Sequence, residues 1–288
     1  HDLPPFFKSI IAWMTESLQF LKKIYIIFII AYNGDIDTED YEMIKKLIVN
    51  ADDFGMTEGN SIGILMAHAD GILTSTTCMM NMPFAKFALD QAKNYPDLGV
   101  GIHLVLTVGR PLVDGAKSYT DKDGNFIRPK DYPDHQPHAD PEELYTEWKA
   151  QIEKFIEIAG KKPTHIDSHH HVHLLPQHQE VVIKLAREYD LPIRQRDQII
   201  DNYEYVRCND QMYDDLITYD FMSNSMKVDE ETLEYMCHPA YVDQRLYDMT
   251  SYCLPRMKEL ALLRSEEMKN FIKDNNIQLI NYSDLKKI

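Results

Sequence analysis

The chain has 288 residues, of which 44% are hydrophobic and 26% charged, a composition typical of an ordinary globular protein. Its formal net charge of −16 argues against nucleic acid or an anionic membrane surface as a partner. The four cysteines (Cys78, Cys208, Cys237 and Cys253) lack CxxC spacing, so they indicate neither a disulfide framework nor a thiolate metal site and favour a cytoplasmic location.

The first 42 residues differ in character from the rest of the chain. Ile24–Tyr32 is an apolar run of nine residues, too short to cross a bilayer, which needs about 20. The run could be the core of a signal peptide that starts at Met14. Alternatively, Met43 is the natural start, because MIKKLIVN opens a buried strand at once. We expect residues 1–42 to be an N-terminal extension that a single catalytic domain at residues 43–288 does not need.

From Ile44 onward, segments typical of strands alternate with segments typical of helices. Strands are expected at residues 47–49, 74–80, 100–106, 164–169, 192–194, 233–237 and 278–281, and helices at 57–69, 84–94, 141–160, 177–189 and 255–274. Residues 110–140 read as a long loop, and residues 200–230 give no clear pattern. There is no glycine-rich dinucleotide motif or P-loop. The alternation predicts an α/β protein with a (β/α) barrel-like fold, an irregular TIM-type barrel with fewer than eight full units.

The densest polar motif is the run His165–His173, which holds five of the twelve histidines and Asp167. If residues 164–169 form a strand, its two-residue repeat places His165, Asp167 and His169 on one face. Imidazole and carboxylate are ligands that divalent metals prefer. We interpret the run as part of a metal site. The alternative is an exposed histidine-rich loop that chelates metal only by accident.

Three further polar groups occupy related positions in the predicted barrel. Asp52 and Asp53 follow the first strand, His103 lies within the third, and His238 ends the strand 233–237. The active sites of such barrels lie at the carboxyl ends of the strands. Taken singly, Asp52-Asp53 could be a capping turn, and each histidine could be a core residue with its hydrogen bonds satisfied. Their joint placement favours a common site.

An aspartate and two histidines around a divalent ion leave positions open for water and substrate. Such a site increases the acidity of water and polarises a carbonyl. A second carboxylate would serve as general base and a further histidine as general acid. The constellation predicts metal-assisted hydrolysis of an amide or an ester, and sequence spacing does not separate the two.

Several longer motifs resemble one known family. The YdjC-like carbohydrate deacetylases, which include the chitooligosaccharide (diacetylchitobiose) deacetylases, are similar to this chain at LIVNADDFG (47–55), GIHLVLT (101–107), THIDSHHHVHLLPQ (164–177) and CHPAY (237–241). Shorter matches are GILTSTT (71–77), SYCLPR (251–256) and INYSDL (280–285). The resemblance runs from about Met43 to the C-terminus.

The resemblance implies a barrel-like fold and a bound divalent metal. It also implies removal of an acetyl group from an N-acetylated amino sugar within an oligosaccharide such as chitobiose. Carried over to this chain, the metal ligands are Asp53, His103 and His169. Magnesium is the metal usually described for the family, although two imidazoles suit zinc or cobalt better. The identity of the metal therefore stays open.

The same resemblance implies roles for three catalytic residues. Asp52 would be the base that activates water, His238 the acid that protonates the leaving amine, and Arg194 the residue that orients the base. The remaining polar residues of the histidine-rich run would orient the ligands or line the pocket; they are His165, Asp167, His170, His171 and His173.

The expected partner is an N-acetylated oligosaccharide, with neither nucleic acid nor membrane. Proteins of this family tend to be dimers, so a homodimer is expected. Two other functions compete with deacetylation. One is metal-dependent hydrolysis of another carbohydrate bond, such as a phosphoester or a glycoside, although adjacent Asp52 and Asp53 are poorly spaced for a glycosidase. The other is a non-catalytic protein that binds sugar or metal. Fold alone separates none of these.

Overall fold

The computed structural model describes residues 42–195 and 203–288. The predicted N-terminal extension lies almost wholly outside the described residues, so its role stays a prediction. Within the described residues one sheet contains seven strands: β1 (Lys46–Phe54), β2 (Ser75–Cys78), β3 (Gly99–Leu104), β4 (Ile166–Ser168), β5 (Arg207–Asn209), β6 (Thr232–Cys237) and β7 (Gln278–Leu279).

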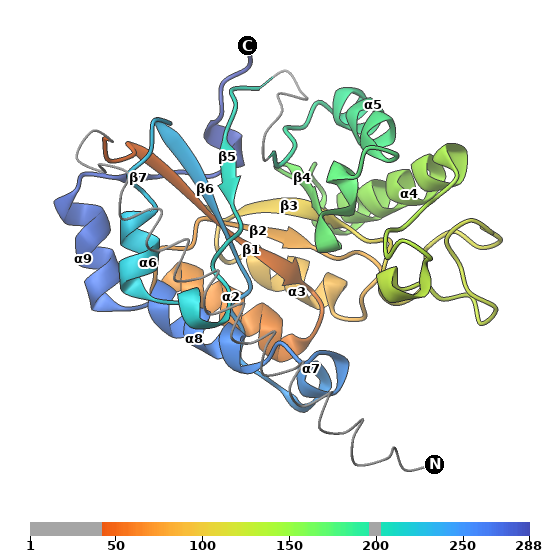
Figure 1. The fold of residues 1–288 in the computed structure, drawn as a ribbon, viewed down its shortest axis with the longest axis horizontal. Helices are drawn as coiled ribbons and strands as arrows, with labels where there is room; N and C mark the ends of the chain where they lie inside the picture. Colours follow the sequence, from red (N-terminus) through yellow and green to blue (C-terminus); the bar gives the residue numbers. More distant parts are fainter. Residues whose placement is uncertain (1–41, 196–202) are drawn as a thin grey trace, which may run out of the picture. The chain divides into compact units, whose positions relative to one another are not determined.

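The strands are all parallel. Their order is β4-β3-β2-β1-β6-β5, and β7 pairs with the start of β1. β1 lies near the centre, with Lys46–Ala51 opposite Thr232–Cys237 of β6. After Lys46, every residue of β1 is buried, as expected of a parallel strand covered on both faces. Because all strands run the same way, their carboxyl ends meet at one end of the sheet (Figure 1).

A short extended segment joins the two edges of this sheet. Ile193 forms a parallel bridge with Ile166 of β4, and Gln195 forms one with Arg207 of β5. The backbone N–H of Arg194 donates to the carbonyl of Ile166 at 2.9 Å. The curled sheet is therefore closed by single bridges rather than by a full strand. This confirms the predicted (β/α) barrel-like fold in its irregular form.

Helices lie along the outside of the sheet, and α2, α3 and α4 pack against β1, β2 and β3 in turn (Figure 1). The described helices are α2 (Glu58–Ala69), α3 (Ala85–Ala92), α4 (Pro141–Ala159), α5 (Gln179–Tyr189), α6 (Tyr219–Asn224), α7 (Gln244–Met249), α8 (Leu254–Leu263) and α9 (Glu266–Asp274). Their ends follow local chemistry. The Asp140 side chain caps α4 by accepting two backbone N–H groups, and Gly160 ends it with a left-handed φ of 70°.

Three predicted elements need correction, and the strand expected at residues 192–194 is present only as the isolated bridges described above. β1 runs on through Asp52 and Asp53, which were expected after the strand. The strand expected at 164–169 covers only Ile166–Ser168, because His170 and His171 take left-handed φ values of 57° and 52° and turn the chain into the 3-10 helix η3 (His169–Leu174). The helix expected at 255–274 is divided into α8 and α9, since Ser265 caps a new helix there. The unreadable stretch 200–230 contains β5, α6 and the short 3-10 helix η4 (Asp214–Leu216).

The long loop at 110–140 is fastened to α4. The buried carboxylate of Glu147 accepts the backbone N–H groups of Leu112 at 3.0 Å and Val113 at 2.9 Å. Glu143, one turn earlier, accepts those of Lys117 and Ser118. Hydrogen bonds to two helical carboxylates therefore position a loop that has, in the described chain, only one 3-10 turn (η2, Pro129–Asp131) and one bridge pair of its own.

Within residues 42–195 and 203–288, no helix combines the length and the apolar character needed to cross a membrane.

Candidate active site

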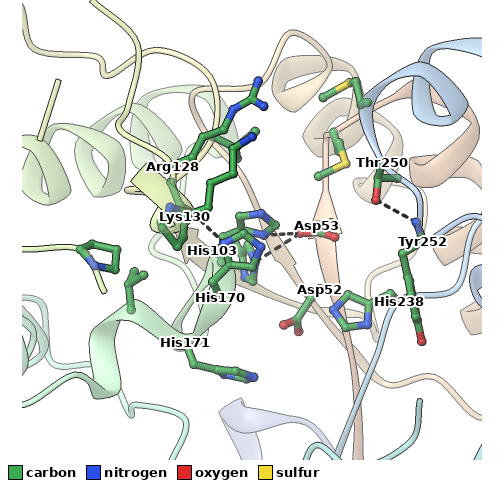
Figure 2. A pocket seen from close by; sticks show the side chains of 18 of the residues that line it. Asp52, Asp53, His103, Arg128, Lys130, His170, His171, His238, Thr250 and Tyr252 are labelled. Carbon is green, nitrogen blue, oxygen red and sulfur yellow. Dashed lines mark hydrogen bonds and ion pairs between the residues drawn. The ribbon is translucent and has the colours of Figure 1, made fainter. Parts of the chain in front are cut away.

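A cavity of about 830 Å³ lies at the carboxyl ends of the strands. β1 contributes Asp52 and Asp53 to it, β3 contributes His103, and His169 and His238 follow β4 and β6 directly. Figure 2 shows the two aspartates and His238 near one another in this cavity, with His103 and His170 beside Asp53. The structure thus brings His103, which the sequence placed within a strand, together with the side chains that it placed at strand ends.

Asp53 has an unusual backbone that decides how the two aspartates diverge. Its φ is 68°, in the left-handed region, and the pairing of β1 with β2 shifts register between Ala51 and Phe54. In a regular strand, neighbouring side chains point to opposite faces. The local turn instead lets both carboxylates line the same cavity, each against a different set of partners.

Asp53 lies at the centre of a cluster that could hold a metal ion. Its Oδ1 is 3.0 Å from Nδ1 of His169 and 3.4 Å from Nε2 of His103, and one ligand atom from each of the three residues lies within 4.8 Å of the others. Its Oδ2 accepts a hydrogen bond from Arg256 at 2.7 Å. One aspartate and two histidines are a common ligand set for divalent transition metals.

The two ring nitrogens of His103 have different surroundings. Its Nδ1 is 2.7 Å from Oδ1 of Asp167, whereas its Nε2 is buried without a hydrogen-bond partner among the described residues. Burial would lower the pKa of His103, but the Asp167 carboxylate raises it to about 10. Without a metal, this imidazole therefore holds a proton at the position that a metal ion would take. A carboxylate behind a metal-binding histidine is the usual outer partner of such a ligand.

The balance of buried charge also suits a cation. Five buried carboxylates surround the site, and two buried guanidinium groups face them; these are Asp52, Asp53, Asp167, Glu234 and Glu259 with Arg194 and Arg256. A divalent ion beside Asp53 would place positive charge next to carboxylates whose burial is otherwise costly. A second possible ligand group, Asp52 with His103 and Asp167, fits less well, because Arg194 already occupies both oxygens of Asp52.

Asp52 is held by a two-pronged pair with Arg194. Nη1 and Nη2 of Arg194 donate to the two oxygens of Asp52 at 2.8 and 2.7 Å, and Asn50 donates to Oδ1 at 3.0 Å. Burial would raise the pKa of Asp52, but the Arg194 guanidinium holds it below its ordinary value. Asp52 is therefore an ionised carboxylate of fixed orientation at neutral pH.

His238 reaches the cavity from the end of β6, against an aromatic wall. The ring centroids of Tyr213 and Tyr252 lie 5.9 and 5.8 Å from its own. Its backbone N–H donates to Glu259, which also accepts the Tyr252 hydroxyl at 2.8 Å. Burial, assisted by Arg256, lowers the pKa of His238 to about 4. The imidazole is neutral at neutral pH, so a role as acid requires that it gain a proton during the reaction.

The other residues of the histidine-rich run divide into two groups. His170 and His171 line the cavity, and Asp167 holds His103. His165 and His173 lie outside the residues that line the cavity. His165 stacks on Tyr282 with ring centroids 3.8 Å apart, and Nδ1 of His173 bonds to the hydroxyl of Ser168. Although β4 spans only three residues, His165 and Asp167 lie on the same face of the sheet, against Gly101 and His103 of β3, and His169 contacts Asp53 beside His103.

Sequence reasoning missed several residues that the structure places here. Arg256 and Glu259 lie one turn apart on α8, Glu234 lies on β6, and Tyr213 precedes η4. Arg256 ends the motif SYCLPR, which contributed to the family resemblance but gave no role for the arginine. A lone glutamate in a strand and a tyrosine in an unreadable stretch carry no local signal, since only the fold brings them to the site.

Known proteins are similar to this chain over the residues that build this site. The family model described as YdjC-like protein matches residues 46–274. The chain belongs to the YdjC-like family. Among its relatives, the carbohydrate deacetylase of Clostridium beijerinckii is 40% identical over 250 residues, covering 83% of this chain and all of that protein. The carbohydrate deacetylase of Geobacillus stearothermophilus is 42% identical over 255 residues, covering 85% of this chain and all of that protein.

A solved relative from Enterococcus faecalis V583 shares the fold of this YdjC-like chain. It is described as a cellobiose-phosphate cleavage protein and is 34% identical, with a TM-score of 0.76 over 83% of this chain and 98% of its own. The YdjC-like match begins at the first residue of β1 and includes all the candidate site residues named so far. The motif at residues 280–285 lies beyond it.

Proposed function

We propose that the protein is a metal-dependent carbohydrate deacetylase that removes the N-acetyl group from an acetylated amino-sugar oligosaccharide such as chitobiose. The observation that carries the proposal is the convergence of Asp53, His103 and His169 beside an oriented, ionised Asp52 in one cavity. The relatives named carbohydrate deacetylases support the same reaction class.

The chain's own residues divide the work of amide hydrolysis. Asp53, His103 and His169 would hold the divalent ion, with Asp167 fixing the orientation of the His103 ring. When bound, such an ion supplies a Lewis acid that polarises the acetyl carbonyl and makes water more acidic. The histidine donors suit zinc or cobalt as well as magnesium, so the metal is a question for experiment.

Proton transfer falls to Asp52 and His238. Asp52 is ionised and accepts the proton of the attacking water, while Arg194 keeps its carboxylate facing the cavity. His238, neutral at rest, takes up the proton that Asp52 has accepted from water and delivers it to the departing amine nitrogen. The products are acetate and a free amino sugar.

The cavity has features suited to a short sugar chain. Its volume of about 830 Å³ lies within the range of about 300–1,000 Å³ for small-molecule sites. Tyr213 and Tyr252 line it with aromatic surface against which a sugar ring can pack.

A phosphorylated disaccharide is a second candidate substrate. Arg128 and Lys130, from the long loop, line the same cavity and lie on the side of His103 and His170 (Figure 2). Two cations at the rim would accept a phosphate on the sugar. The name of the solved relative, which refers to cellobiose phosphate, points in the same direction.

Acetate release by the metal-stripped protein tests the proposal. Diacetylchitobiose and its phosphorylated form are offered in parallel, each without metal and with added magnesium, zinc or cobalt. We expect release only with metal, and the faster substrate decides between the two sugars. Release of reducing ends or phosphate instead of acetate would indicate hydrolysis of another bond. Sugar binding without any turnover, despite bound metal, would indicate a binding protein.

A further inference from the structure

The motif INYSDL at residues 280–285 resembles the family pattern but has no part in the site described so far. It brings Tyr282 to the interior of the barrel. In the 3-10 helix η5 (Tyr282–Asp284), a reciprocal capping box fixes the turn: Asn281 accepts the N–H of Ser283 at 2.8 Å, and Asp284 accepts the N–H of Asn281 at 2.9 Å. Tyr282 is 2% exposed, so this short turn is built to present one buried phenol.

The ring and the hydroxyl of Tyr282 have separate contacts. The ring stacks on His165 at 3.8 Å with an interplanar angle of 8°. Gly101 on β3 leaves room for that imidazole, because a Cβ there would lie 2.5 Å from the ring. The hydroxyl donates to Oε2 of Glu234 on β6. The ring of Tyr282 is thus positioned by stacking on His165, and its hydroxyl orients one carboxylate oxygen of Glu234.

Glu234 in turn holds Arg194. Its Oε1 accepts Nε of Arg194 at 2.9 Å and Nη2 at 2.8 Å. Asp52 accepts Nη1 and Nη2, and Asp167 faces Nη1 at 2.9 Å. The guanidinium has five N–H donors, and these contacts provide an acceptor for each of them. Its orientation toward Asp52 is therefore determined by carboxylates behind and beside it.

We propose that Glu234 and Tyr282 are positioning residues, which lock the guanidinium of Arg194 so that its two terminal nitrogens face the carboxylate of Asp52. The proposal rests on the proposed function in so far as Asp52 is the base. Neither residue is among those that line the cavity or among the candidate metal ligands. They act on turnover through Arg194, and not through a direct contact with the candidate metal ligands.

The variant Tyr282→Phe removes the hydroxyl and keeps the ring that stacks on His165. Its matched control is Tyr235→Phe. Tyr235 is the next residue on β6, is fully buried, and places its hydroxyl 2.6 Å from that of Ser225, away from Arg194. Both variants lose one buried phenolic hydroxyl, so a general effect of the loss on folding appears in both.

We expect Tyr282→Phe to lower kcat by about tenfold, with KM and the affinity for added cobalt within about twofold of the original protein. Glu234→Gln, which loses the charge but keeps an acceptor, should lower kcat in the same way. Tyr235→Phe should leave kcat within about twofold. Equal loss of kcat in Tyr282→Phe and Tyr235→Phe, or a fall in cobalt affinity that parallels kcat, would overturn the proposal.

A second readout does not depend on activity. Arginine side-chain NMR signals, with Arg194 identified by Arg194→Lys, report hydrogen exchange at the guanidinium nitrogens. Exchange at Arg194 should be slow in the original protein, faster in Tyr282→Phe and unchanged in Tyr235→Phe. If no acetate is released by the original protein, the deacetylase function fails while this measurement still decides the positioning role. Unchanged Arg194 signals in Tyr282→Phe would overturn that role.

Discussion

Two neighbouring aspartates contact different partners here because one residue leaves the extended conformation. The left-handed φ of Asp53 turns its carboxylate to His103, His169 and Arg256, while Asp52 faces Arg194. A non-glycine residue in this region carries a strain of about 1–3 kcal/mol. The paired guanidinium groups stabilise the arrangement, so the two carboxylates stay distinct at the level of single contacts.

Removing the charge of Asp52 should separate turnover from metal binding. In Asp52→Asn the amide no longer accepts a proton from water, so kcat should fall by at least about 100-fold. Cobalt affinity should be unchanged, because Asp52 is bonded to Arg194 and not to the ligand group. Acetate release and cobalt titration measure the two effects. A near-normal rate would contradict the assignment of Asp52 as base.

His169 and His170 offer a matched pair of adjacent imidazoles. Their ring centroids are 4.0 Å apart, yet only His169 contacts Asp53, while Nδ1 of His170 lies 3.0 Å from the hydroxyl of Thr107. His169→Ala should weaken cobalt binding by more than about 100-fold, beyond the cost of losing an outer partner. His170→Ala should bind cobalt as the original protein does. Equal weakening in both variants would rule out His169 as a specific ligand.

Glu259 should make stability depend on pH. Burial raises its pKa to about 7, well above the 4.5 of an unfolded chain. A raised carboxyl pKa stabilises the fold below pH 4.5, and this contribution is lost as the pH rises toward 7. Relative to Glu259→Gln, the free energy of unfolding should therefore fall by up to about 3 kcal/mol between pH 4.5 and 7.5. Urea unfolding of both metal-free proteins at the two pH values checks this. A constant difference would show that Glu259 keeps an ordinary pKa.

The long loop at 110–140 and the helix α4 determine which charged side chains line one side of the cavity. The loop at 110–140 carries Arg128 and Lys130, and its backbone is bonded to Glu143 and Glu147 of α4. A glutamate buried in a helix face would otherwise be costly, and here two backbone donors compensate it. The helix thus supports a loop that lines the cavity.

Glu147→Ala should release that loop. It leaves the N–H groups of Leu112 and Val113 without their acceptor, which should lower the free energy of unfolding by about 2–4 kcal/mol. Limited trypsin cleavage at Lys122 or Lys130 should become faster. Glu153→Ala, on the exposed face of the same helix, should change stability by only about 0.5 kcal/mol. Equal cleavage of both variants would show that Glu147 does not anchor the loop.

The limits of sequence reading are clearest at the level of elements. Capped helices such as α2 and α4, and the buried apolar start of β1, could be predicted because local chemistry specifies them. A strand of three residues, such as β5, has too short a period to be recognised. The candidate ligands were implied by the resemblance of the motifs that contain them to one family. Arg256 and Glu234 could not be found this way, since their partners lie far away along the chain.

At the scale of the whole molecule, the strand pairings of the barrel differ in length. β1 and β6 pair along six positions, whereas Ile193 and Gln195 close the ring by one bridge each. Short pairings open more readily than long ones, so we expect the described part of this side to be less stable than the pairing of β1 with β6.

A chain shortened to residues 43–288 should fold and keep its activity. All seven described strands and the candidate site lie within it, and the family match begins at residue 46. Its kcat and its melting temperature should therefore agree with those of the full chain within about twofold and a few degrees. Circular dichroism and acetate release measure both. Failure to fold would show that residues 1–42 are part of the catalytic domain.

Arg194 lies between the two residues whose bridges close the barrel, and its side chain crosses the interior to carboxylates on β1, β4 and β6. Arg194 therefore links three strands across the interior and, under the proposed function, also orients the base. A gene copy released from selection for activity would be expected to lose Asp52 before it lost this arginine. If Asp52 is the base, relatives that no longer turn over substrate should retain Arg194 more often than Asp52.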